Sequence, residues 1–209
     1  MKGLLRKDFL LLRAYGRSLL LLLVLFLGIG VTSGTNIIVG IVMIESIMLS
    51  VSTFSYDDMA KWNAYMLSMP VSRKTAVREK YVFALLLGLI GIVLSLLAGL
   101  LAGAIRGNID WRELGWTVGA CLTIAFLYLS IMMPLAFRYG AEKMRILLLA
   151  VFFVLFFILF GGYVLLSKSA PGALASLMRL WPIFPVLMVA SLSISYVISQ
   201  RIFEKKEIF

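Results

Sequence analysis

The chain has 209 residues, of which 62% are apolar and only 14% charged, and its formal net charge is +10. Globular proteins are about 45–50% apolar and about 25% charged, so this composition excludes a soluble domain and indicates an all-α integral membrane protein. At about 20 residues per spanning helix, the length leaves room for six spans and short connections, but not for an added soluble catalytic domain.

Missing residue types narrow the chemistry. The chain has no histidine, and its single cysteine, Cys121, lies in an apolar run. HExxH metalloproteases and Ser-His hydrolases are therefore excluded. The sequence also lacks the GxxxxGK[ST] motif that cradles nucleotide phosphates, and it shows no cluster of paired Asp or Glu residues of the kind that holds metal for phosphoryl transfer. We expect a chain that is not an enzyme and binds no metal, cofactor or nucleic acid.

The N-terminal segment, residues 1–17, has an amphipathic pattern. At 100° per residue, the segment has a basic face and an apolar face. The basic face holds Lys2, Arg6, Arg13 and Arg17, and the apolar face holds Leu4, Leu5, Leu11, Leu12 and Tyr15. Such a helix lies along the inner leaflet. Two roles stay open, an anchor on anionic lipid and a lever that touches a cytoplasmic partner. Asp8 lies within the apolar face, which suggests a protein partner for that face.

Apolar runs separated by charged or turn-forming clusters predict six membrane spans. Each should be helical, because the backbone must satisfy its own hydrogen bonds in lipid. The predicted spans are residues 18–33, 37–55, 82–105, 114–136, 146–167 and 180–200. The segments that would lie on the same side of the membrane as the N-terminus hold sixteen of the twenty basic residues. Since basic residues favour the cytoplasmic side, both termini are predicted to lie inside. The first span resembles a secretory signal but lacks a small-residue cleavage site, so we expect it to be retained.

The second predicted span carries polar residues. Glu45 is the only acid well inside a span, and burying it costs about 2–3 kcal/mol or more unless it is paired or hydrated. Ser46, Ser50 and Thr53 form a polar stripe on the same helix. This side should line an interface or a pathway, and Glu45 could be hydrogen-bonded to a neighbouring helix, relay protons or contact a substrate.

The inner connection, residues 56–81, is too long and too patterned for a turn. Pro70 divides it, and Ser72 is placed to cap a short helix that follows. Arg73, Lys74, Arg78 and Lys80 should make that helix basic on one surface. Ala76 and Val77 fall on its other side.

The third predicted span has small residues four apart, including Gly91 and Gly99. This spacing lets helices approach closely, either within the bundle or across a dimer seam. On the outer side, residues 168–179 predict a short helix at the membrane interface before the last span.

The basic amphipathic N-terminus, the six spans, the small outer loops and the inner loop together resemble the permease subunits of ABC-2 type ABC transporters. The specific part is residues 61–81, which carry W-N-x-Y-x-L-S-x-P-V-S-R followed by a K-Y pair. This tract is similar to that of small bacterial permeases that pair with a separate ATPase.

The resemblance implies roles for three segments. The inner loop would be the coupling helix that docks on the ATPase, the N-terminal helix with Arg6, Asp8 and Arg13 the connecting helix, and the outer segment before the last span the external helix. The implied docking residues are Pro70, Val71, Ser72, Arg73, Lys74, Ala76, Val77 and Arg78.

The resemblance also implies an assembly and an activity. Two permeases, identical or paralogous, would join two ATPases that hold ATP and Mg²⁺, in the bacterial cytoplasmic membrane. They would export an amphipathic or hydrophobic substrate, such as a peptide or a lipid-like molecule. Two alternatives stay open, a stand-alone immunity or scaffold protein in the membrane and a proton-coupled carrier that uses Glu45.

Overall fold

The computed structural model describes residues 2–33, 35–68, 72–107, 110–169 and 184–205. These residues form helices joined by short turns, which confirms the predicted all-α class for the described part of the chain. The helices are α1 (Lys2–Ser33), α2 (Thr35–Met59), α3 (Trp62–Leu67), α4 (Arg73–Arg106), α5 (Trp111–Ser169) and α7 (Phe184–Lys205). The predicted external helix falls mostly in 170–183, outside the described residues.

Three described segments are long and apolar enough to cross a membrane: Ile37–Met59, Arg73–Ile105 and Trp111–Val151. They contain the second, third and fourth predicted spans. The number of six spans and the orientation of the termini stay predictions.

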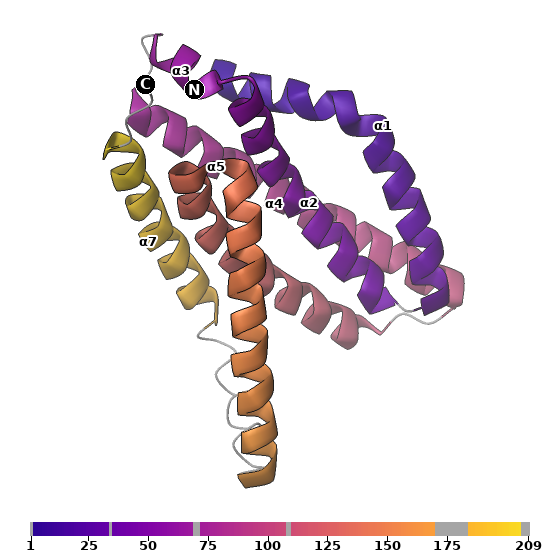
Figure 1. Cartoon of the computed structure of the whole chain (residues 1–209). Coiled ribbons are helices and arrows are strands. Elements are labelled where there is room, and N and C mark those ends of the chain that lie inside the picture. Colours follow the sequence, from indigo (N-terminus) through magenta and orange to yellow (C-terminus); the bar gives the residue numbers. More distant parts are fainter. Residues whose placement is uncertain (1, 34, 69–71, 108–109, 170–183, 206–209) are drawn as a thin grey trace.

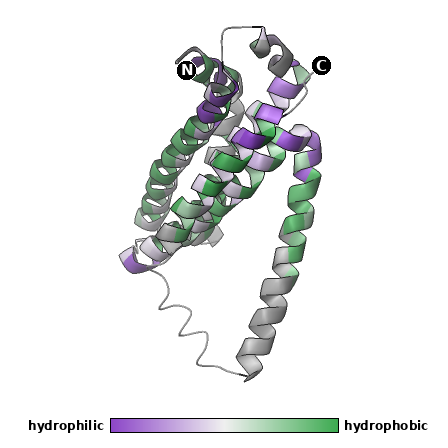
Figure 2. Cartoon of the chain, turned by 90° about the vertical axis from the view of Figure 1, so that its left-hand side faces the viewer, coloured by the Kyte–Doolittle hydropathy of each residue, from purple (hydrophilic) through white to green (hydrophobic). Residues whose placement is uncertain are grey.

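Helices α2, α4 and the first half of α5 pack together as the centre of the bundle, with α1 against α2 and α4, and α7 against α5 and α4. The first part of α1 lies across one end of the bundle before the helix bends and descends beside α2 (Figure 1). Five segments meet at this end of the bundle: the start of α1, the end of α2, α3, the start of α4 and the end of α7. Hydrophilic residues gather there (Figure 2). We call it the polar end.

The coupling helix and the third span were predicted as separate elements, but α4 is one continuous helix of 34 residues. No proline or glycine interrupts residues 73–87, so nothing ends the helix where the apolar run begins. Ser72 is the N-cap, as predicted, with its Oγ 3.2 Å from the backbone N of Thr75. At 1.5 Å per residue α4 is about 50 Å long, so it extends beyond a hydrocarbon core of about 30 Å.

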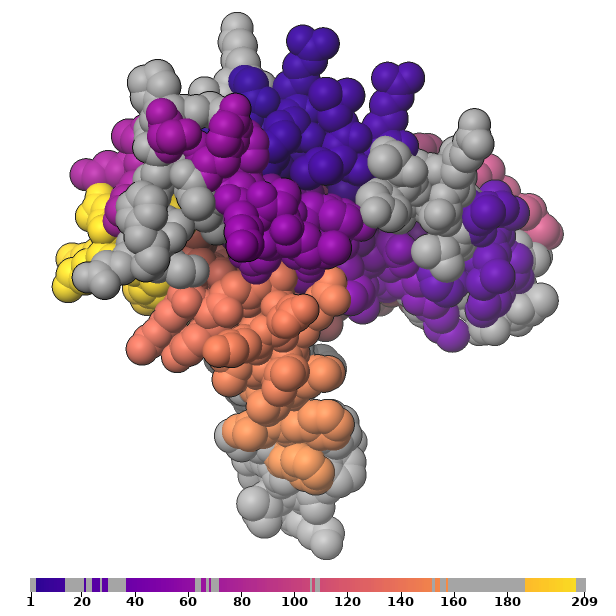
Figure 3. Space-filling model, turned by 45° about the horizontal axis from the view of Figure 1, so that its top comes forward, coloured from indigo at the N-terminus to yellow at the C-terminus, as the bar shows by residue number. Residues whose placement is uncertain are grey.

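Helix α5 contains a reversal of the chain at Gly140. This residue has φ 79° and ψ 174°, whereas Pro134, a few residues earlier, lies inside the helix. Residues 111–139 and 141–169 are therefore two helices that meet at one glycine (Figure 1). The second of them projects from the bundle (Figure 3). Its exposed apolar side chains include Ile146, Phe153 and Phe157.

Small residues set the distance between α2 and α4. A Cβ added at Gly91 would lie 2.7 Å from Ser46 Cβ, and one at Gly99 would lie 2.9 Å from Val39 Cγ2. These glycines let the two helices approach closely, which is one of the two packing roles that the spacing predicts.

Gly91→Ala should therefore force α2 and α4 apart, because Ser46 Cβ is fixed to the backbone and cannot swing away. Overpacking of this kind costs about 1–3 kcal/mol. The matched control is Gly88→Ala, one turn away, where an added Cβ meets nothing within 4 Å. Reversible SDS unfolding in mixed micelles would measure both variants. Equal stability of the two would contradict the close approach at Gly91.

Candidate functional site

Four charged side chains form a closed ring beneath the first part of α1. Lys80 Nζ of α4 lies 2.6 Å from Asp8 Oδ2 of α1 and 2.6 Å from Asp57 Oδ2 of α2. Lys7 Nζ of α1 lies 2.9 Å from Asp8 Oδ1 and also pairs with Asp57 Oδ1. Each carboxylate oxygen thus faces one lysine, and cations alternate with anions. The contact between Lys7 and Asp8 is an ion pair without hydrogen-bond geometry. We call these residues the charge ring.

The charge ring is buried among polar and aromatic neighbours. The side chain of Asp8 is fully buried, and those of Asp57 and Lys80 are nearly so. Lys80 also donates a hydrogen bond to Thr53 Oγ1 at 3.3 Å. Lys7 Nζ lies 4.4 Å from the ring centroid of Trp62, which brings α3 into contact with the charge ring.

Glu79 is a third buried acid beside the charge ring. Its side chain is buried, and within the described part of the chain Oε1 accepts no hydrogen bond. Glu79, Asp57 and Lys80 line a cavity of about 20 Å³. That volume has room for one water molecule, which would hydrate the carboxylate.

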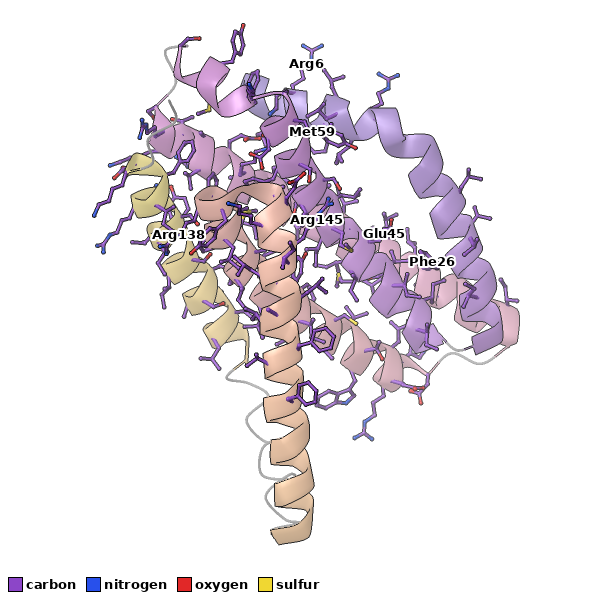
Figure 4. The ribbon with its side chains drawn as sticks, in the orientation of Figure 1. Arg6, Phe26, Glu45, Met59, Arg138 and Arg145 are labelled. Atoms are coloured by element: carbon purple, nitrogen blue, oxygen red, sulfur yellow. The ribbon has the colours of Figure 1, made fainter. Side chains whose placement is uncertain are left out.

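The sequence suggests a protein partner for the apolar face of α1, but this face packs on the chain's own helices. Leu12 is buried with Phe83 and Leu87 of α4, and Asp8 enters the charge ring. The opposite face keeps Arg6, Leu10 and Arg13 exposed, at spacings of four and three. Arg6 points away from the bundle (Figure 4).

The start of α4 divides into an exposed face and a buried face. Ser72, Lys74 and Arg78 are exposed. Ala76 and Val77 are buried in the main core, so they support the helix and are covered from outside. Pro70 and Val71 lie outside the described residues.

Arg73 is held by the end of α7. Its Nη1 donates hydrogen bonds to the backbone oxygens of Phe203 and Glu204, at 3.2 and 2.6 Å. A guanidinium satisfies the last carbonyls of a helix and favours its negative end. Tyr81 directly follows Lys80 in α4, and its Oη lies 2.6 Å from Ser195 Oγ and 2.8 Å from Ser199 Oγ of α7. The start of α4 is thereby tied to α7.

The polar stripe of the second predicted span lies at a helix interface. Ser46, Ser50 and Thr53 are buried, and each donates its hydroxyl hydrogen bond to a carbonyl of α2 itself. Glu45 is half-buried. It lies one turn from Leu49, which packs against the cluster of Leu12, so Glu45 is on the side of α2 nearest α1 (Figure 4).

The connection between the two halves of α5 is tied to the end of α2. Asp58 Oδ2 accepts a hydrogen bond from the backbone N of Ala141 at 2.7 Å, and Arg145 Nη2 donates to Ser55 Oγ at 3.1 Å. A carboxylate at a helix N-terminus satisfies an otherwise unpaired N–H and favours the positive end of the helix dipole. Asp58 therefore caps the helix that begins at residue 141.

Sequence reasoning singled out Asp8 but missed Lys7 and Asp57, since contacts between residues far apart in the chain give no local pattern. It placed Lys80 on the basic surface of the coupling helix, which was wrong, because Lys80 is buried between Asp8 and Asp57. One usable signal was present. Asp57 and Asp58 are an acidic pair in a chain with only ten acidic residues, and they follow directly on an apolar span.

A family model described as ABC-2 family transporter protein matches residues 3–204. No curated protein and no solved structure matches the chain.

Proposed function

The chain belongs to the ABC-2 family of transporter proteins, and we propose that it is the membrane-spanning permease subunit of an ABC exporter in the bacterial cytoplasmic membrane. A separate nucleotide-binding subunit, in two copies, would bind and hydrolyse ATP with Mg²⁺. A second permease, identical or paralogous, would complete the assembly. The observation that carries this proposal is the family match over residues 3–204, in a sequence without a phosphate-binding GxxxxGK[ST] motif.

In this proposal the ATPase docks on the exposed start of α4. Ser72, Lys74 and Arg78 face outward there, and charged groups at the rim of an interface fix its register more than its affinity. Since α4 is one continuous helix, a push on its first turn is carried directly into the bundle. Arg6 and Arg13, exposed on α1, belong to the neighbouring surface.

The substrate we propose is amphipathic or hydrophobic, with a peptide as the first candidate. An apolar pocket of about 230 Å³ lies between α2 and α5 and supports an apolar cargo. Its lining includes Ile44, Ile47, Met48, Cys121 and Ile124. Outward movement is consistent with short outer connections, which leave little chain to capture a dilute solute.

Affinity purification tests the partner. The tagged chain is extracted from native membranes in mild detergent, and the eluate is analysed by mass spectrometry and for ATP hydrolysis. We expect a stoichiometric P-loop ATPase with the unaltered chain, and its loss with the double variant Lys74→Glu, Arg78→Glu. A surface that complements the positive Lys74 and Arg78 would be negative, and two glutamates at these positions would repel it strongly enough to exclude the partner.

Arg112→Glu is the control for that experiment. Arg112 is exposed at the start of α5, away from the polar end, so the same change of charge there should leave the ATPase bound. Recovery of the chain alone under several extraction conditions would contradict the permease proposal. If the double variant still retained the ATPase, the docking surface would not be the start of α4.

A further inference from the structure

The charge ring joins three helices at the polar end. Lys7 and Asp8 come from α1, Asp57 from α2 and Lys80 from α4, and all four ion pairs between them are formed. Lys80 is two residues from Arg78 on the exposed face of α4. The ring therefore lies directly beneath the surface on which we propose that the ATPase docks.

We propose that the charge ring is a joint that locks the first part of α1 to the start of α4, so that the two move as one body during transport. Lys7, Asp8, Asp57 and Lys80 are then positioning residues for coupling. The role in transport rests on the proposed function, whereas the locking of the two helices does not.

Stability alone is a weak reason for such a ring. Buried ion pairs are often replaced by well-packed apolar residues at no cost, because desolvation offsets the attraction between the charges. What a ring adds is geometric specificity. Each carboxylate oxygen already faces its own lysine, so every charge depends on two others.

A slide of α1 along α4 would break the Lys80–Asp8 pair, which is the direct link between the two helices. The separated charges would stay buried, because Leu12, Phe83 and Leu87 close the contact beside them. An uncompensated buried charge is strongly unfavourable. The ring thus resists relative movement more steeply than an apolar contact, which has no direction and can repack.

Spin labels test this joint in the chain alone. Leu10 of α1 and Leu85 of α4 are exposed and stand outside the ring, so Leu10→Cys and Leu85→Cys carry the labels in a Cys121→Ala background. The labelled chain is mixed with excess unlabelled chain in lipid nanodiscs, and pulsed electron paramagnetic resonance gives the distance distribution. We expect one narrow peak with the intact ring.

The ring is opened by Asp8→Asn with Lys80→Met. This change leaves the Lys7–Asp57 pair intact and the charges balanced, and we expect the single peak to broaden, shift or split. Should that protein not fold, Asp8→Asn alone breaks the same Lys80–Asp8 pair and leaves Lys7 and Lys80 both paired with Asp57. A peak as narrow in the opened ring as in the intact ring, or a broad peak in the intact ring, overturns the proposal.

An exposed ion pair provides the matched control. Lys74→Met with Glu204→Gln removes the pair between α4 and α7 whose atoms lie 3.6 Å apart. This control should leave the narrow peak unchanged. If the peak broadened as much in this control as in the opened ring, the labels would respond to the loss of any ion pair, and the proposal would be overturned.

The complex with its ATPase gives the functional readout. On trapping with ATP and vanadate, the distance between the labels should stay constant with the intact ring and change with the opened ring, while ATP hydrolysis persists in both. A change in the intact ring as large as in the opened ring would overturn movement as one body. If no ATPase is recovered, the proposed function fails. The nanodisc experiment still decides whether the charge ring fixes the first part of α1 to the start of α4.

Discussion

Lys80→Met should lower the free energy of unfolding by about 3–5 kcal/mol, the cost of removing one partner from a buried ion pair. The substitution leaves Asp8 and Asp57 sharing Lys7 as their only cation in the ring. Methionine fills a volume close to that of the lysine stem, so the loss comes from charge rather than from a cavity. Reversible SDS unfolding in mixed micelles measures it.

Two further variants separate this effect from a general one. Lys74→Met makes the same change at a side chain that is 70% exposed, where an ion pair contributes about 0–1 kcal/mol. Adding Asp8→Asn to Lys80→Met restores the balance of charge, so the double variant should be more stable than the single one. The ring would be contradicted if Lys80→Met were as stable as Lys74→Met, or if the double variant were no more stable than Lys80→Met.

Local features of the fold could be predicted from the sequence. The apolar runs predict α2, α4 and the first half of α5 because the hydropathy of a segment decides whether it can lie in lipid. Ser72 was recognised as a cap because capping involves only the next three residues. The basic face of α1 could be predicted in the same way, from periodicity alone.

Features that depend on distant residues could not be predicted. Asp8 was conspicuous in an apolar face, but its partner Lys80 lies 72 residues away, and which lysine reaches it depends on how α1 crosses the bundle. The helix from Ser72 was predicted to end before the third span, since a charged segment beside an apolar one reads as two elements. The backbone is continuous through both because no residue there opposes a helix.

The sequence predicts that the chain turns back within residues 137–145, between the fourth and fifth predicted spans, but not that the turn takes a single residue, Gly140. Residues 137–145 read as a charged connection, and a connection is expected to take several residues, but here one glycine is enough. A glycine with φ 79° and ψ 174° turns the chain while helices continue on both sides. Asp58 at the end of α2 then caps the new helix, another contact that local sequence does not encode.

Gly140→Ala should therefore destabilise the chain by about 1–3 kcal/mol through backbone strain alone, because this region of φ and ψ is open essentially only to glycine. A Cβ at residue 140 would also lie 3.0 Å from Asp58 Oδ2, the oxygen that caps Ala141. Strain and loss of the cap act on the same turn. We expect the second half of α5 to lose its fixed connection to α2 before the rest of the bundle unfolds.

Gly115→Ala is the matched control, since Gly115 lies in the first half of α5 and an added Cβ there meets nothing within 4 Å. This control should be neutral or slightly stabilising, because alanine favours a helix by about 0.5–1 kcal/mol over glycine. SDS unfolding compares the two variants, and proteolysis near residue 140 reports the turn itself. If both alanines gave the same stability and the same cleavage, the turn would not require glycine, and residues 137–145 would form a longer connection than the one described here.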